Sequence, residues 1–332
     1  MMDLSIEYLG LQLRSPLVAS AGPLQKDIGN IRQMEEAGLA AIVLHSLFEE
    51  QIELEALHLD RALSAGTESF FESLSYFPDL SQYNFGPDAY LEHIRKAKEA
   101  VGIPIIASLN GITPGGWVEY ARAMEQAGAD AIELNIYDFP TSTEDTSIEV
   151  ERRYEGLVIQ LRDNIRIPIA VKLSPYFTSL PNFAQRLDRA GIAGLVLFNR
   201  YYQTDFDIEE LEVFPNLHLS ERSEILLRLH WTGVLYGRVT CSLAVTGGVH
   251  SHIEAIKSVM AGASAVMMTS CLLQRGISYA RQIGDEMARW LEEHEYVSVG
   301  QMRGNMGYRL VRNKSAFERA NYMKVLSSYA LR

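Results

Sequence analysis

A unit that recurs along the chain begins with the stretch Leu243-Ala244-Val245-Thr246-Gly247-Gly248-Val249 and continues through the segment that follows it. An apolar run ends in Thr-Gly-Gly, an amphipathic stretch follows, and the dipeptide Ala261-Gly262 closes that stretch. A second apolar run, Ala265-Val266-Met267-Met268-Thr269, begins directly afterwards. Short apolar runs that alternate with amphipathic stretches are typical of parallel strands joined by helices.

The same unit recurs along the chain. Ala-Gly also closes amphipathic stretches at Ala37-Gly38, Ala127-Gly128 and Ala190-Gly191, and an apolar run follows each time. Glycine readily adopts the left-handed conformation that ends a helix, so one helix-to-strand connection is used four times. Because the runs are apolar on both faces, they indicate a parallel sheet covered by helices. The predicted strands cover residues 16–20, 41–46, 103–108, 131–136, 167–172, 194–199, 243–246 and 265–269.

Eight such strands predict an α/β fold of the (β/α)8 TIM-barrel type, whereas a doubly wound sheet usually has five or six strands. Long connections, residues 47–83 and 201–221, follow the second and sixth strands, on the face that carries active sites in such barrels. Residues 1–15 predict an N-terminal β-hairpin around Gly10 that plugs the barrel bottom. We predict one domain over residues 1–332, with residues 296–332 as a C-terminal extension.

Composition excludes several classes of function. The 332 residues include 30 Lys and Arg and 42 Asp and Glu, so the formal net charge of −12 disfavours nucleic acid as a partner. We find neither a membrane-spanning apolar stretch nor a signal peptide, and therefore expect a cytoplasmic protein without membrane association. Cys241 and Cys271 have no metal-ligand spacing, so we expect no metal, no iron–sulfur centre and no disulfide framework.

Polar side chains end most of the predicted strands. The carboxyl ends of barrel strands meet at one rim, so these side chains are expected to share a site. For any one of them a polar residue that merely ends a strand is an equally good interpretation, but their coincidence over eight strands favours a binding site. They are Ser20, His45, Ser46, Ser108, Asn110, Asn135, Lys172, Asn199, Thr246 and Thr269.

The last two strands and the fifth carry the most informative residues. Thr246-Gly247-Gly248 and Thr269-Ser270 follow strands seven and eight, where bare backbone N–H groups of such barrels often hold a phosphate. Lys172 ends strand five, and its ammonium needs an anion or acceptors. Several roles remain open for Lys172: it could form a Schiff base, contact a phosphate, contact a flavin or donate a proton. A salt bridge to Glu133 or Asp138 that only stabilises the barrel is also open.

The loop after strand four offers groups for recognition and proton transfer. Asn135 presents a donor and an acceptor, which suit the edge of a heterocycle. Tyr137 and Asp138 are candidate acid–base groups, and a solvated loop carboxylate is an equally good interpretation of Asp138.

These residues resemble the dihydroorotate dehydrogenase group of barrels that depend on flavin mononucleotide (FMN). The motifs are Ser20-Ala21-Gly22, Glu133-Leu134-Asn135, Val171-Lys172-Leu173-Ser174-Pro175, Thr246-Gly247-Gly248-Val249 and Met268-Thr269-Ser270. The resemblance implies an FMN-dependent oxidoreductase of pyrimidine biosynthesis. It would act on the CH–CH group of a small, dihydroorotate-like cyclic substrate and transfer hydride to flavin N5. A small molecule or a protein would accept the electrons, and a homodimer is compatible with the family.

The resemblance also assigns residues by position. Its flavin ring contacts are Ser20, Ala21, Gly22, Asn135, Lys172 and Asn199, to which strand-end position adds Ser46 and Asn110. Its phosphate contacts are Gly247, Gly248, Thr269 and Ser270. Lys172 would stabilise negative charge on reduced flavin, and His45 would contact substrate or flavin electrostatically. Asp138 or Tyr137 would be the acid–base residue.

The chain departs from the family at its substrate positions. His45-Ser46 stands where the family carries Lys-Ser, and imidazole is shorter and titrates near neutrality. The loop Asn135-Ile136-Tyr137-Asp138-Phe139-Pro140-Thr141 lacks the family's Cys or Ser base. The sequence therefore supports FMN binding better than dihydroorotate. A flavoprotein with another substrate or an electron-relay role is one alternative, and a lyase or isomerase with a Lys172 Schiff base is another.

Overall fold

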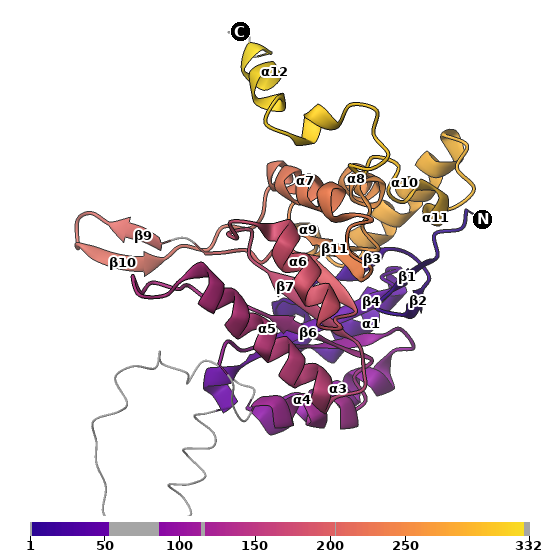
Figure 1. The fold of residues 1–332 in the computed structure, drawn as a ribbon. Coiled ribbons are helices and arrows are strands. Elements are labelled where there is room, and N and C mark those ends of the chain that lie inside the picture. Colours follow the sequence, from indigo (N-terminus) through magenta and orange to yellow (C-terminus); the bar gives the residue numbers. More distant parts are fainter. Residues whose placement is uncertain (1, 53–85, 114–116, 203, 329–332) are drawn as a thin grey trace, which may run out of the picture.

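The core of the protein is a closed parallel barrel of eight strands, which confirms the predicted (β/α)8 architecture (Figure 1). This computed structural model describes residues 2–52, 86–113, 117–202 and 204–328. Around the barrel the strands follow one another in chain order and close by pairing the last with the first. They are β3 (Leu17–Ala19), β4 (Ala41–Phe48), β5 (Ile105–Asn110), β6 (Ala131–Asn135), β7 (Ile169–Leu173), β8 (Gly194–Leu197), β11 (Ser242–Thr246) and β12 (Ala265–Met268).

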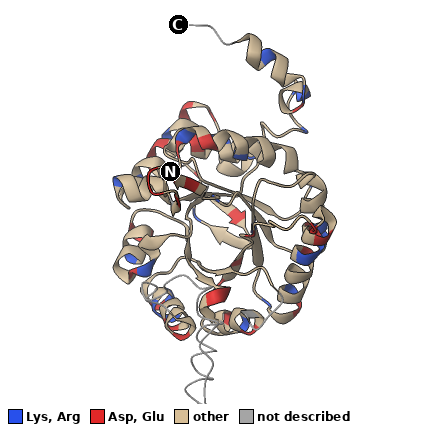
Figure 2. Ribbon diagram, turned by 90° about the vertical axis from the view of Figure 1, so that its left-hand side faces the viewer, with Lys and Arg blue, Asp and Glu red and all other residues tan. Residues whose placement is uncertain are grey.

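Helices surround the barrel and cover its outer face, as the view along the barrel axis shows (Figure 2). Their apolar sides pack on strands whose residues are buried almost throughout, so the core lies both inside the barrel and between barrel and helices. The α-helices are α1 (Ile28–Glu36), α3 (Pro87–Ala100), α4 (Trp117–Gln126), α5 (Ser147–Asn164), α6 (Leu180–Arg189), α7 (Ile225–Leu235), α8 (His252–Ala261), α9 (Ser270–Arg275), α10 (Tyr279–Glu293), α11 (Val299–Met302) and α12 (Asn321–Ser327). Short 3-10 helices are η1 (Pro23–Lys26), η4 (Arg222–Glu224) and η5 (Lys314–Phe317).

The four Ala-Gly pairs end helices as the sequence predicts. Each glycine follows a helix with φ between +94° and +124°, in the region that a side chain strains. A barrel strand begins shortly after each one, so the repeated dipeptide sets the return of the chain to the barrel. These glycines are Gly38, Gly128, Gly191 and Gly262.

The predicted N-terminal hairpin consists of β1 (Ile6–Tyr8) and β2 (Leu11–Leu13), which pair antiparallel. The Leu9 backbone N–H donates to Ser242 Oγ at 3.2 Å, at the start of β11. A Cβ on Gly194, the first residue of β8, would lie 2.5 Å from a Leu9 methyl carbon. The turn of the hairpin is therefore packed into the amino-terminal end of the barrel, as predicted, and Tyr8 is fully buried.

The two long connections differ in what the structure describes. Residues 53–83 of the first lie outside the described residues. The second, residues 201–221, contains an antiparallel pair, β9 (Thr204–Asp207) and β10 (Glu212–Pro215), where the sequence predicted a loop without regular structure. Its signal was the alternation of charged and apolar residues on both sides of a turn at residues 208–211. Within the described residues, none of the helices combines the length and the apolar character needed to span a bilayer.

Candidate active site

A cavity of about 550 Å³ opens at the carboxyl ends of the barrel strands, within the range of small-molecule sites, roughly 300–1,000 Å³. The structure brings most of the predicted site residues together on its wall. These are Ser20, Ala21, Gly22, His45, Ser46, Asn110, Asn135, Tyr137, Lys172, Asn199, Gly247, Gly248, Thr269 and Ser270. Asp138 is not among the residues that line it.

Three strands present polar side chains at one level of the wall. Asn110, Asn135 and Lys172 are register partners on β5, β6 and β7, because parallel pairing aligns the strand ends. Lys172 Nζ lies 3.1 Å from Glu133 Oε1, so the salt bridge considered from the sequence forms while Lys172 still faces the cavity. Asn135 Oδ1 is buried and accepts no hydrogen bond from the described residues. A buried amide oxygen without a donor is an acceptor position for a ligand.

The glycine turn after β11 lies close to α7. Gly247 and Gly248 have φ of +88° and +80°, and a Cβ on Gly248 would lie 2.5 Å from the Ile225 backbone nitrogen. A Cβ on Gly247 would lie 2.9 Å from the guanidinium of Arg228, which donates from Nε to Thr246 O. Both the backbone conformation and the space therefore require glycine, and the turn brings the main chain to the cavity wall.

Two serines complete the wall beside this turn. Ser220 Oγ and Ser270 Oγ are 2.8 Å apart, and the Gly248 backbone N–H donates to Ser220 Oγ at 3.2 Å. Thr269 Oγ1 donates to Ser20 O, and Ser20 Oγ lies 3.0 Å from Thr246 Oγ1. Hydroxyls and a backbone N–H gathered in this way suit a phosphate. We call residues 246–248, 269–270 and Ser220 the glycine rim.

The loop after β6 is held by contacts from distant elements. Asp138 accepts from Arg153 Nη2 at 2.8 Å and from the Tyr154 hydroxyl at 2.7 Å, both on α5. Its carboxylate is therefore directed to α5, and the structure does not bring it to the cavity with the other candidate residues. Tyr201 after β8 donates to Asp138 O and stacks on Tyr137 with ring centroids 4.7 Å apart.

Tyr137 is the acid–base candidate of this loop that lines the cavity. Its phenol oxygen accepts from the Tyr202 backbone N–H at 3.1 Å. Burial raises the pKa of Tyr137 above its ordinary value, so the phenol keeps its proton at neutral pH. Tyr137 packs with Phe139, Tyr176 and Tyr201 in an aromatic cluster that we call the aromatic rim.

His45 lies on β4 at a bulge, where pairing with β5 shifts between Val43 and Ser46. Bulges re-aim side chains beside active sites. The imidazole packs edge-to-face on Tyr90 and beside His93. Burial, and secondarily His93 and Lys26, lower its pKa to about 3, so His45 is neutral at physiological pH. It is therefore not a replacement for a fixed positive charge.

The electrostatics of the wall oppose those of the whole chain. Lys26, Lys172 and Arg200 line the cavity, and no Asp or Glu does so among the described residues. Glu133 and Glu224 pair with Lys172 and Arg200 from behind the wall. In a protein of net charge −12, a cavity lined by cations and hydroxyls selects an anionic ligand.

Sequence reasoning missed several residues of this wall. Lys26 ends the short helix η1, and Arg200 and Ser220 come from loops, in each case without a recognisable motif. Arg228 lies on α7 and not at a strand end. It supports the glycine turn by donating a hydrogen bond from Nε to Thr246 O. Only the position of Lys26 and Arg200 just beyond the first and sixth strands could have pointed to them.

Comparison with known proteins agrees with this geometry. The family model described as dihydroorotate dehydrogenase matches residues 80–291, more than half of the chain. The chain belongs to the dihydroorotate dehydrogenase family. Members of this family are oxidoreductases that act on CH–CH groups with a flavin, in pyrimidine biosynthesis.

Curated relatives of this family cover nearly the whole chain. A dihydroorotate dehydrogenase B (NAD(+)) catalytic subunit of Thermoplasma acidophilum is 27% identical, over 92% of this chain and 99% of the relative. One of the same name from Methanocaldococcus jannaschii is 25% identical, over 87% and 94%. A protein of Aeropyrum pernix, provisionally named dihydroorotate dehydrogenase A (fumarate), is 26% identical, over 87% and 92%. The names of these relatives differ in the electron acceptor.

Proposed function

We propose that the protein is an FMN-dependent oxidoreductase that acts on the CH–CH bond of a small cyclic substrate, with dihydroorotate as the first candidate. The observation that carries the proposal is the composition of the cavity at the barrel mouth. The family motifs converge on one wall that combines cations, hydroxyls and a glycine turn, without a lining carboxylate among the described residues.

The described residues fit a flavin nucleotide. The glycine rim offers the phosphate the hydroxyls of Ser220 and Ser270 beside the Gly248 backbone. Asn135 Oδ1 offers the ring an acceptor without a competing donor. Residues proposed to hold the phosphate are Gly247, Gly248, Thr269 and Ser270, and those proposed to hold the ring are Ser20, Ala21, Gly22, Ser46, Asn110, Asn135, Lys172 and Asn199.

The bound flavin would supply hydride transfer, and the protein would supply position, charge and protons. Lys172 places a positive charge at the wall, held there by Glu133, and would stabilise negative charge on a reduced flavin ring. Tyr137 carries a proton into the cavity and is held by the Tyr202 N–H and the ring of Tyr201. We assign proton transfer to Tyr137 rather than Asp138, which is bonded to α5. In the oxidative direction its phenolate would accept the substrate proton, and in the reductive direction its phenol would give one.

The raised pKa of Tyr137 favours a second candidate within the same chemistry. A phenol that keeps its proton is suited to give one, and proton donation belongs to reduction of a C=C bond. The protein would then reduce a cyclic unsaturated carbonyl or amide. An electron-relay role is the third candidate, since Asp138, the only carboxylate candidate for the base, points away from the cavity.

The visible spectrum of the isolated protein tests the cofactor. We expect flavin absorbance that is retained on dialysis and restored by adding FMN to stripped protein, with weaker retention of riboflavin, which lacks the phosphate. Protein that stays colourless after reconstitution would exclude the flavin.

Anaerobic reduction tests the substrate. Dihydroorotate should bleach the flavin of the wild type, and orotate should reoxidise the reduced protein, against a free-FMN control. Tyr137→Phe should slow bleaching by about 10²–10⁴-fold without loss of flavin. If dihydroorotate fails to bleach while dithionite succeeds, the cofactor assignment stands and the substrate is another cyclic compound.

A further inference from the structure

Three cationic side chains line the cavity, and carboxylates neutralise two of them. Lys172 Nζ lies 3.1 Å from Glu133 Oε1, and Arg200 Nη1 lies 2.8 Å from Glu224 Oε1. The third is Lys26, which forms no ion pair with any residue that the structure describes. Within the described part of the wall, the charge of Lys26 is therefore the one that no protein carboxylate compensates.

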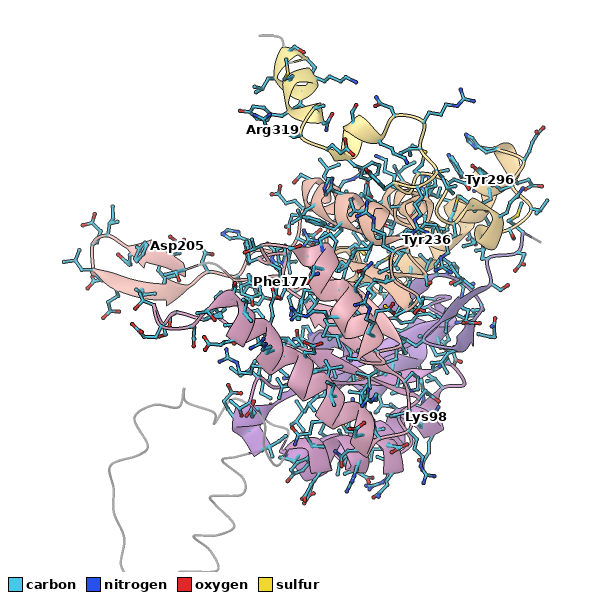
Figure 3. All side chains as sticks on the ribbon, viewed as in Figure 1. Lys98, Phe177, Asp205, Tyr236, Tyr296 and Arg319 are labelled. Atoms are coloured by element: carbon cyan, nitrogen blue, oxygen red, sulfur yellow. The ribbon has the colours of Figure 1, made fainter. Side chains whose placement is uncertain are left out.

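Lys98 and Lys26 show two different uses of a lysine. Lys98, which Figure 3 labels on the outside of the barrel, has its Nζ 2.7 Å from Asp130 Oδ2. The carboxylate next to Lys26 in the sequence is not used in this way. Asp27 Oδ1 accepts from the Asn30 backbone N–H at 3.0 Å and caps α1 instead. The ammonium of Lys26 is thus left to a ligand in the cavity that it lines.

The backbone that carries Lys26 is fixed by its neighbour in η1. Gln25 is buried, and its Nε2 donates to Ser20 O at 2.7 Å. The backbone oxygen of Gln25 lies 2.7 Å from Nε2 of His93 on α3. The side chain of Lys26 itself is exposed. The short helix therefore presents a flexible ammonium to the cavity from a fixed position.

The part of the wall beside η1 has no positive charge of its own. The short helix packs against β4, whose His45 and Ser46 line the cavity. His45 is neutral at physiological pH, and Ser46 Oγ lies 2.8 Å from Ser108 Oγ. The charge of Lys26 reaches this part of the wall, because it is one of the causes that lower the pKa of His45. Lys26 is therefore the cation on the β4 side of the cavity.

We propose that Lys26 binds the carboxylate of the substrate and thereby selects a cyclic carboxylate over its neutral counterpart. This inference rests on the proposed function and names the substrate class of the same site. Hydrogen bonds between an ammonium and a carboxylate are stronger than those between neutral groups, and the long lysine stem lets the charge follow the ligand. The glycine rim follows β11 and β12, whereas Lys26 lies beside β4, so the substrate carboxylate and a flavin phosphate would occupy different sides of the barrel.

Equilibrium titration of the flavin-loaded protein with orotate and with uracil tests this role. The two probes differ only in the carboxylate, so the ratio of their dissociation constants isolates its contribution. The wild type should bind orotate at least about tenfold more tightly than uracil. Lys26→Met should weaken orotate at least about tenfold and uracil less than about twofold, and Lys26→Arg should keep most of the preference.

Lys257→Met is the matched control. Lys257 is an exposed lysine on α8 that does not line the cavity, and its substitution changes the net charge as Lys26→Met does. It should bind orotate and uracil as the wild type does. The affinities of Lys26→Met for FMN and for riboflavin should also equal those of the wild type, because the proposed contact is with the substrate. Circular dichroism and flavin absorbance establish that each variant is folded and loaded.

Several outcomes would overturn the role of Lys26. One is a Lys26→Met protein that keeps the preference for orotate, and another is an equal loss in Lys257→Met, which would indicate a general effect of charge. A loss of FMN affinity without a loss of riboflavin affinity would make Lys26 a phosphate contact. A wild type that prefers neither orotate to uracil nor nicotinate to nicotinamide would reject the carboxylate. Failure of the proposed function has a different signature, namely protein that does not bind flavin.

Discussion

The glycine rim and Tyr137 of the aromatic rim line the same cavity, but the two rims are built in different ways. The glycine rim consists of backbone and short hydroxyl side chains, whose positions follow from the chain path at Gly247 and Gly248. The aromatic rim consists of large side chains from separate parts of the chain, and its Tyr137 is held by the ring of Tyr201 and the backbone N–H of Tyr202. A backbone-built site can be read from a local motif, whereas a side-chain-built site depends on partners that are remote in sequence.

Lys172 lies on the cavity wall, and its removal should have the largest effect. Lys172→Met leaves the buried Glu133 carboxylate unpaired, which should cost about 3–5 kcal/mol in the free energy of unfolding. Flavin affinity should fall at least about tenfold. The double variant K172M/E133Q should recover stability but not affinity, as measured by denaturant unfolding and flavin titration. Unchanged affinity in both variants would remove Lys172 from the site.

The glycine rim should tolerate no side chain. Gly248→Ala combines a φ of +80° with a Cβ 2.5 Å from backbone, and should cost about 2–4 kcal/mol and most of the flavin affinity. Gly276→Ala is the matched control, because Gly276 has a similar φ of +84° with no atom within 4 Å of the added Cβ. It should cost about 1–2 kcal/mol and leave binding intact. If Gly248→Ala and Gly276→Ala lowered stability and flavin affinity equally, the glycine rim would have no specific role in binding.

In the loop after β6, substitutions of Asp138 and Tyr137 should distinguish a structural role from a chemical one. Asp138→Asn weakens the contacts to Arg153 and Tyr154 and should cost about 1–2 kcal/mol, with turnover reduced less than about threefold. Asp138→Asn should not show the large loss of flavin reduction that is expected for Tyr137→Phe. A loss of about 100-fold or more in Asp138→Asn would return the role of base to Asp138.

The last effect is a pH dependence and concerns His45, which lines the cavity from β4. Its pKa is lowered from 6.5 to about 3 by burial, so below pH 6.5 the unfolded chain takes up a proton that the folded protein does not. Stability should therefore fall with decreasing pH between 6.5 and 3, by at most about 1.4 kcal/mol per pH unit from this group. His45→Gln should flatten that slope in urea unfolding at pH 7, 6 and 5. A parallel slope in the variant would contradict the neutral buried imidazole.

The barrel and most of the residues that line its cavity could be predicted, because strand periodicity and the repeated Ala-Gly pairs are local signals. The wall residues at strand ends, such as Asn135 and Lys172, follow once the strands are placed. Their roles toward a cofactor stay predictions until the experiments above are done.

The remainder depended on contacts that no local pattern contains. The carboxylate of Asp138 is turned away by Arg153 and Tyr154 on α5, and a loop sequence does not reveal that choice. Ser220 reaches the glycine turn from a connection with no motif. The β9–β10 hairpin was missed because its apolar residues face outward, and core-seeking patterns do not register exposed strands.

The hydrogen bond from the Leu9 N–H to Ser242 Oγ has a consequence for biosynthesis. The two residues are 233 positions apart, so Leu9 is synthesised long before its partner at the start of β11. Contacts of such long range slow folding, because the loop they close must be ordered first. Until β11 is synthesised, the turn at Leu9 lacks part of the surface that buries it in the folded protein.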